Sequence, residues 1–197
     1  YIASVGILET ALNRHDFSFA YVGEVSSSTL PLPFTISAMW AGMAGSLLFW
    51  TFLTGIAATS AVAVQAKRHP ELVPVAAATL SGILFFFTLV LAFGANPFAS
   101  ASPVPLDGPG LTPLLQSAFL PIHPVMLYAG LTGFAVPFAF AVSALVSGRL
   151  DTAWFTSTRR WTMLAWGFLT VGIILGAAWA YTELGWGGYW AWDPVEN

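Results

Sequence analysis

Residues 37–65 read SAMWAGMAGSLLFWTFLTGIAATSAVAVQ, a stretch without a single Asp, Glu, Lys or Arg. About 20 predominantly apolar residues are enough for a helix to cross the hydrocarbon core of a bilayer. Because lipid offers no hydrogen-bond partner to the backbone, an apolar stretch of this length is stable in a membrane as a helix. The stretch therefore predicts a membrane-spanning helix.

The same apolar character recurs along the chain, which predicts an all-α protein, a polytopic integral membrane helical bundle. The further spans are expected at about 72–95, 124–147 and 161–182. Residues 1–12 form a shorter apolar run, which we interpret as the end of a span, so we expect the chain to be truncated at both ends. A single membrane domain, 1–197, then carries irregular outer loops at 13–36, 96–122 and 183–197.

Composition supports the membrane assignment and limits the chemistry. The chain is 57% hydrophobic and 8% charged, whereas about a quarter of the residues of a soluble domain carry charge. A net charge of -3 without a basic face argues against nucleic acid as a partner. The absence of cysteine means that any thiol chemistry must use a thiol from another protein.

The basic residues predict the orientation. Five of the six lie in the two loops expected at one membrane face, and these are Lys67, Arg68, Arg149, Arg159 and Arg160. By the positive-inside rule this face is cytoplasmic. The three irregular loops then lie on the outer face.

The outer loops and two prolines predict local features. Residues 13–36 are expected to form a short strand or an interfacial strip, and the proline-rich loop 96–122 a rigid cover with an amphipathic helix over 111–120. Pro74 and Pro137 fall inside predicted spans, where a kink is expected.

Residues 186–197, WGGYWAWDPVEN, concentrate aromatic side chains after the last span. Trp186, Tyr189, Trp190 and Trp192 predict a wide apolar platform, beside which Gly187 and Gly188 leave room for a ligand. A flat, mostly apolar molecule such as heme suits this platform. The alternative is a simple aromatic belt at the membrane interface. Asp193 and Glu196 have the positions of an N-cap and a first-turn acid, which indicates that a helix begins there.

The three histidines differ in their surroundings. His123 lies between Pro121 and Pro124 at the outer mouth of a span, where its imidazole is able to ligate a metal. A helix cap, or a hydrogen bond to a loop carbonyl, is an equally open interpretation. His69 lies in the basic loop and is interpreted as solvated, and His15 belongs to the first outer segment.

An outward imidazole and an aromatic platform together satisfy the demands of a heme site, axial ligation and apolar contact. We expect Tyr128 about one helical turn below His123. Arg14 is the only basic residue expected on the outer face, so other donors must also serve the heme propionates.

Several stretches, in order, resemble one known family. WGGYWAWDPVEN looks like the tryptophan-rich "WWD" signature of heme-handling proteins of cytochrome c biogenesis, and its ending resembles the CcmF-type branch of cytochrome c heme lyases. The stretches DFSFAYV, LPLPFTISAMWAGMAGSLLFW, HPVMLYAG and VSGRLD are similar to counterparts in the N-terminal portion of that branch.

This resemblance implies a heme lyase subunit in the bacterial cytoplasmic (inner) membrane, with the tryptophan-rich stretch on the periplasmic side. It implies receipt of heme from the chaperone CcmE and thioether attachment to the CXXCH motif of apocytochrome c, with CcmH/CcmI-type proteins as partners. The implied iron ligand is His123. The implied heme-binding residues are His123, Trp186, Gly187, Gly188, Tyr189, Trp190, Trp192 and Asp193.

The resemblance also has a departure and a limit. The family reads His-Glu where this chain has Met43 and Ala44. A second outer histidine and the ligands of a structural heme b are expected beyond residue 197.

Three alternatives stay open. A heme exporter or delivery protein of a related branch would load the chaperone and not the apocytochrome. A small-molecule transporter would need polar residues inside its spans, and the four complete spans contain no Asp, Glu, Lys or Arg. A membrane scaffold would tolerate substitution of the aromatic platform.

Overall fold

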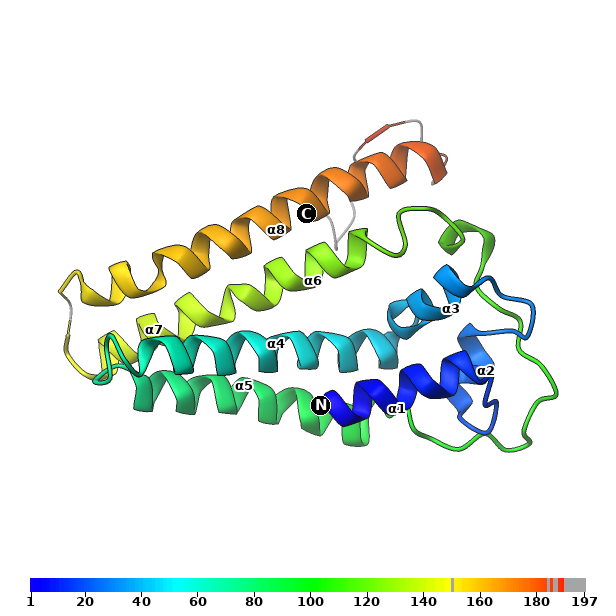
Figure 1. Ribbon diagram of the computed structural model, residues 1–197, viewed down its shortest axis with the longest axis horizontal. Helices are drawn as coiled ribbons and strands as arrows, with labels where there is room; N and C mark the ends of the chain where they lie inside the picture. Colours follow the sequence, from blue (N-terminus) through cyan, green and yellow to red (C-terminus); the bar gives the residue numbers. More distant parts are fainter. Residues whose placement is uncertain (150, 184, 186–187, 190–197) are drawn as a thin grey trace.

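The computed structural model describes residues 1–149, 151–183, 185 and 188–189, and these fold into helices and connecting loops (Figure 1). The helices are α1 (Ile2–Asn13), α2 (Ala20–Val25), α3 (Leu32–Ser37), α4 (Met43–Gln65), α5 (Val73–Phe93), α6 (His123–Gly133), α7 (Ala135–Val146) and α8 (Ala153–Glu183), with 3₁₀ turns η1 (Ala38–Trp40) and η2 (Pro113–Leu115). Within the described residues, β pairing is limited to an isolated bridge between Phe19 and Ser100. The predicted all-α class is confirmed.

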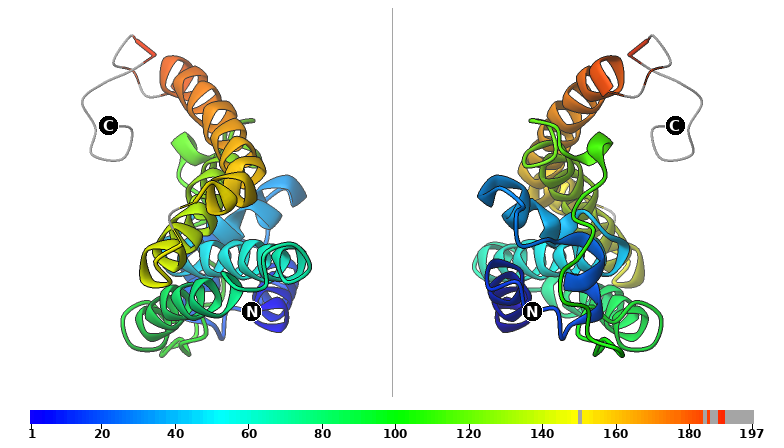
Figure 2. Two further views of the ribbon diagram at one scale, coloured as in Figure 1. Left: turned by 90° about the vertical axis from the view of Figure 1, so that its left-hand side faces the viewer. Right: turned by 90° about the vertical axis from the view of Figure 1, so that its right-hand side faces the viewer.

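Four helical segments within the described residues are long and apolar enough to cross a membrane: Met43–Gln65, Val73–Phe93, His123–Val146 and Trp154–Glu183. They lie side by side as a bundle (Figure 1). Seen end-on, α1, α4 and α5 occupy one side of the bundle and α8 the other (Figure 2). Large apolar side chains such as Phe86 and Phe93 of α5 point outward, as expected where lipid is the solvent.

The third span is broken at Phe134, between α6 and α7. Pro137 explains the break, because it has no N–H to offer to the carbonyl of Gly133 and its ring crowds that carbonyl. Pro74 instead lies in the first turn of α5, where the backbone N–H has no intrahelical partner in any case. Of the two prolines expected to kink a span, only Pro137 lies beside a break.

The first outer segment contains α2 and α3, so the predicted short strand is wrong there. Tyr21 of α2 is buried, and its hydroxyl donates a hydrogen bond to the carbonyl of Ala38 at 2.8 Å. Burial raises the pKa of Tyr21, so the phenol stays protonated as a donor. This long-range bond fixes α2 against the start of α4, a constraint that local sequence does not display.

The second outer segment is tied to the first by backbone bonds. The N–H of Ala20 donates to the carbonyl of Ala99 at 2.8 Å, and the N–H of Ala101 to that of Ser18 at 2.7 Å. The helix predicted over 111–120 is reduced to the η2 turn. Leu111 and Leu120 are buried in the cluster beneath the outer loops and do not face lipid.

Candidate functional site

His123 is the first residue of α6, at the end of its span that adjoins the proline-rich loop 96–122. Its backbone N–H donates to the carbonyl of Phe119 at 2.8 Å, and Pro124 follows in the first turn of the helix. Proline is favoured there because its fixed φ suits a helix start. The prolines noted in the sequence thus fix where α6 begins, and with it the position of the imidazole, which is only 7% exposed.

Two glycines of α8 bring that helix directly against α6. A Cβ on Gly172 would lie 2.8 Å from the backbone nitrogen of Leu127, and one on Gly176 would lie 2.5 Å from Cε1 of His123. Both distances are shorter than carbon atoms tolerate. Glycine at these two positions therefore lets the imidazole lie directly on the backbone of α8.

The imidazole is oriented by a hydrogen bond to α8. Nδ1 of His123 lies 2.8 Å from the carbonyl oxygen of Gly172. Because a carbonyl oxygen only accepts, Nδ1 carries the proton in this bond and Nε2 keeps its lone pair. Metal-ligating histidines commonly donate their second ring N–H to a carbonyl in this way. The sequence left three interpretations open, metal ligation, a helix cap and a hydrogen bond to a loop carbonyl. The structure shows a hydrogen bond, but its acceptor, Gly172, belongs to the helix α8. The bond uses Nδ1 and leaves Nε2 for ligation.

Trp179 of α8 completes the surroundings of His123. The two rings meet edge to face, with centroids 5.5 Å apart and an interplanar angle of 82°. The indole N–H of Trp179 donates to the carbonyl of Leu114 at 3.2 Å, which links the histidine to the proline-rich outer loop. Sequence reasoning missed Trp179. Its signal was the spacing of Gly172, Gly176 and Trp179, which places all three on one helix face.

Tyr128 lies on a different face of α6 from His123. Its ring stacks on Trp50 of α4 at 5.7 Å and 14°, and its hydroxyl donates to Oγ of Ser46 at 3.3 Å. Five residues correspond to about 1.4 helical turns, so the two side chains diverge. Tyr128 thus lies little more than one turn below His123, close to the expected position, but its side chain does not face the histidine.

The predicted aromatic platform falls mostly outside the described residues. The structure does not describe Trp186, Gly187, Trp190, Trp192, Asp193 or Glu196. It does describe Gly188 and Tyr189. The ring of Tyr189 stacks on Tyr181 of α8, with centroids 4.6 Å apart and planes at 15°. Sequence reasoning also missed Tyr181, which lies two residues beyond Trp179 and so points to another side of α8.

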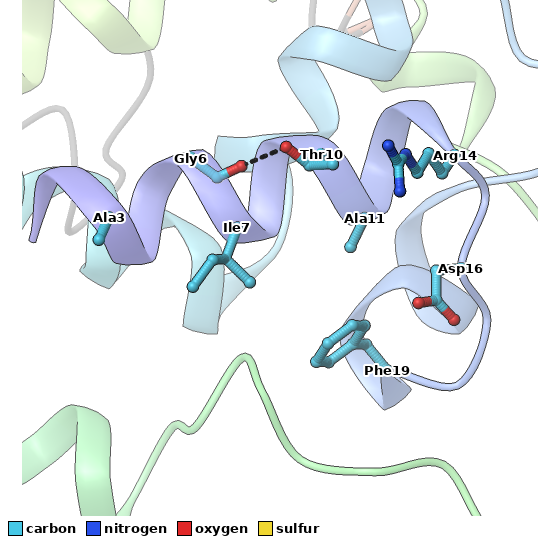
Figure 3. Close-up of a pocket in the computed structure, with 8 residues that line it drawn as sticks. All are labelled: Ala3, Gly6, Ile7, Thr10, Ala11, Arg14, Asp16 and Phe19. Carbon is cyan, nitrogen blue, oxygen red and sulfur yellow. Dashed lines mark hydrogen bonds between the residues drawn. The ribbon is translucent and has the colours of Figure 1, made fainter.

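Arg14 lies in a groove of about 490 Å³ along α1 (Figure 3). The groove is lined by α1 residues together with Asp16 and Phe19, and no residue of α6 or α8 lines it. The structure therefore does not bring Arg14 to His123.

The other histidines are also separate from the site. Nδ1 of His69 lies 3.5 Å from Glu71 in the basic loop, and His15, with φ +52°, stacks on Phe17 in the first outer segment. No group of three or more potential metal-ligating side chains occurs among the described residues. Met43 is 83% exposed at the start of α4.

Comparison with known proteins identifies the family. The model for "Cytochrome C assembly protein" matches residues 40–197. The chain is 48% identical over 98% of its length to a "Cytochrome c-type biogenesis protein CcmF" from Pseudomonas aeruginosa, and 46% identical over 97% to one from Escherichia coli K12. It covers 29% and 30% of those relatives, so it spans less than a third of their length.

A solved structure, "Cytochrome c Heme Lyase CcmF", matches with a TM-score of 0.80 and 39% identity. The match covers 100% of this chain and 31% of the other. The contact of α6 with α8, with His123 buried between them, thus occurs in a fold that a solved structure shares. The chain belongs to the cytochrome c assembly protein family, as a multi-pass membrane segment similar to part of CcmF.

Proposed function

We propose that this chain is part of a CcmF-type cytochrome c heme lyase and that His123 is an axial ligand of the heme it transfers. The observation that supports this most directly is the hydrogen bond of Nδ1 to Gly172. It selects the tautomer in which Nε2 is free to coordinate iron, and such a bond also increases the basicity of the ligating nitrogen.

Of the described aromatic residues, Trp179 fits a porphyrin beside that nitrogen. Trp179 meets the imidazole edge to face, whereas the Tyr181–Tyr189 stack lies on another face of α8. Such rings offer large flat faces at a small cost in side-chain entropy. We propose that Trp186, Gly187, Gly188, Tyr189, Trp190, Trp192 and Asp193 provide further apolar surface and contact the heme.

The role of the protein is then to hold heme beside the apocytochrome thiols. Heme supplies the vinyl groups, and the chain has no cysteine of its own, so the CXXCH motif of the apocytochrome supplies the thiols. In the reaction each S–H adds across one vinyl double bond, forming a C–S bond without a leaving group. Holding both reactants in place removes much of the entropic barrier.

The proposal includes partners and a location. Heme arrives from a chaperone of the CcmE type, and CcmH/CcmI-type proteins present the reduced apocytochrome. The His123 end faces the periplasm across the bacterial inner membrane, because five of the six basic residues lie at the opposite end of the bundle. A structural heme b would take its ligands from outside the described residues, because the three described histidines, His15, His69 and His123, lie in separate parts of the structure.

A maturation assay tests the proposal. Full-length protein carrying His123→Ala is compared with one carrying His69→Ala, a histidine at the opposite membrane face, in cells that depend on it for holocytochrome c. We expect loss of holocytochrome c only in the His123 variant. If heme-loaded chaperone fails to accumulate in that variant, the protein acts as a heme exporter; normal maturation would contradict the assignment of His123.

A further inference from the structure

A cavity of about 510 Å³ lies at the end of the bundle remote from His123, between the end of α4 and the start of α8. The residues that line it include Gln65, Arg68, Arg159, Arg160, Trp161 and Leu164. His123 contacts α8 through Gly172, Gly176 and Trp179. The cavity is thus a separate feature of the same helix, at the membrane face that carries the basic residues.

Three arginines line the cavity, Arg68, Arg159 and Arg160. At this end of the bundle Glu71 pairs with His69 and Arg149, and no Asp or Glu is among the residues that line the cavity. A guanidinium stays charged at every physiological pH, and its fork of N–H donors matches phosphate oxygens. The cavity therefore favours a phosphate-bearing anion.

Gln65 indicates, independently of the arginines, that the molecule in the cavity carries a hydrogen-bond donor. Its side chain is buried, with 2% of its surface exposed, and its Nε2 donates to the carbonyl of Ser157 at 2.6 Å. That bond fixes the amide orientation, because the opposite orientation would place oxygen against oxygen. Oε1 is left buried without a hydrogen-bond partner. A buried acceptor is costly unless a donor reaches it, so the occupant should carry a hydroxyl or an N–H.

The remaining lining is apolar and suits a lipid. Trp161 is half-buried and Leu164 is exposed on the outer surface of α8, one helical turn deeper toward the bilayer centre. Tryptophan is favoured at the headgroup level and leucine in the hydrocarbon. The cavity thus offers charge at its aqueous end and apolar surface at its membrane end, the arrangement of a phospholipid.

We propose that this cavity binds an anionic phospholipid of the basic membrane face, with a hydroxylated headgroup of the phosphatidylglycerol class. Its phosphate lies among the three arginines, a headgroup hydroxyl donates to Oε1 of Gln65, and an acyl chain follows Leu164. An ethanolamine headgroup also carries a donor, but its ammonium group would be repelled by the three guanidinium groups. The lipid would then join the end of α4 to the start of α8.

Native mass spectrometry of the full-length protein in detergent, titrated with phosphatidylglycerol, tests the site. The variant is Arg159→Gln/Arg160→Gln, and the control Lys67→Gln/Arg149→Gln removes the same charge from the same face outside the cavity. We expect roughly 30-fold weaker binding of the first bound lipid in the variant, since each basic residue near a membrane surface contributes about 1 kcal/mol. An equal loss in the control would overturn the proposal in favour of a diffuse charge effect.

Two comparisons test the chemistry of the occupant. Wild-type protein should bind phosphatidylglycerol more tightly than phosphatidylethanol, which has the same charge but no headgroup hydroxyl, and Gln65→Met should abolish the difference. Equal binding of the two lipids by the wild type would overturn the role of Gln65, even if the variant failed to fold. Competition by soluble glycerol phosphate at the same concentration would show a free-phosphate site and overturn the lipid assignment.

Discussion

Nδ1 of His123 lies 2.8 Å from the carbonyl oxygen of Gly172, so the imidazole at the start of α6 is held by the backbone of α8. The contact depends on two further residues of α8, Gly176 beneath the ring and Trp179 at its edge. A histidine held in this way is already oriented in the absence of a ligand, which distinguishes it from one that is merely buried.

Gly176→Ala should displace the imidazole, because the new Cβ would lie 2.5 Å from Cε1 of His123. Overpacking of this kind costs about 1–3 kcal/mol, and here the ring or the helix must move. We expect weaker heme retention and a changed absorption spectrum in full-length protein. Gly167→Ala in the same helix is the control, since nothing lies within 4 Å of a Cβ there. An unchanged spectrum for Gly176→Ala would contradict the close contact.

Tyr128→Phe should leave the heme spectrum unchanged, because Tyr128 stacks on Trp50 on another face of α6. The lost hydrogen bond to Ser46 lowers the stability to unfolding by about 1 kcal/mol, which a thermal denaturation curve would measure. A spectral change as large as that of a His123 variant would show that the two side chains act together after all.

Trp179→Phe keeps an aromatic ring beside His123 but loses the indole bond to Leu114. We expect heme binding to persist, while the outer loop around Leu114 exchanges its amide hydrogens faster. Hydrogen exchange followed by mass spectrometry on peptides from 104–120 provides the measurement. The matched control is Trp166→Phe, an exposed tryptophan of α8, and equal exchange in the two variants would refute the link.

Asp107 ties the two outer segments together and should do so in a pH-dependent way. Its carboxylate accepts bonds from Oγ and N–H of Ser28 at 2.6 and 2.8 Å, and these bonds lower its pKa from the ordinary value of 3.8. Because the pKa of Asp107 is lower in the folded than in the unfolded state, its carboxylate stabilises the fold at pH values above the unfolded-state pKa. This stabilisation is lost as the pH falls through the folded-state pKa.

Asp107→Asn should therefore loosen this connection at neutral pH, as acid does in the wild type. Faster exchange of peptides containing Ser28 is the expected sign, and Asp151→Asn at the opposite membrane face is the control. If peptides containing Ser28 exchange equally fast in Asp107→Asn and in the wild type, the carboxylate charge does not hold the two segments together.

The membrane spans could be predicted from sequence because their cause is local: an apolar stretch in lipid must satisfy its own backbone bonds. The start of α6 was equally readable, since Pro121 and Pro124 bracket His123. The helices α2 and α3 were missed because Tyr21 finds its partner, Ala38, seventeen residues away. Local pattern cannot show such a contact.

The site was predictable in part for the same reason. His123 was recognisable as a histidine at the end of a span, but its acceptor on Gly172 lies 49 residues along the chain. Trp179 was overlooked because tryptophan near a span end has an ordinary interfacial explanation. The spacing of five residues already places Tyr128 and His123 on different faces of α6, but which helix each face contacts depends on long-range packing.

The most direct test is the dithionite-reduced absorption spectrum of the full-length protein and of its His123→Gly variant, each purified after co-expression with heme-loaded chaperone and measured with and without imidazole. The account predicts that the variant loses the heme signal of the outer site and that added imidazole restores it, since a free imidazole would occupy the space left by the side chain. An outer-site signal that persists in His123→Gly without imidazole, or wild-type protein without heme, would contradict it.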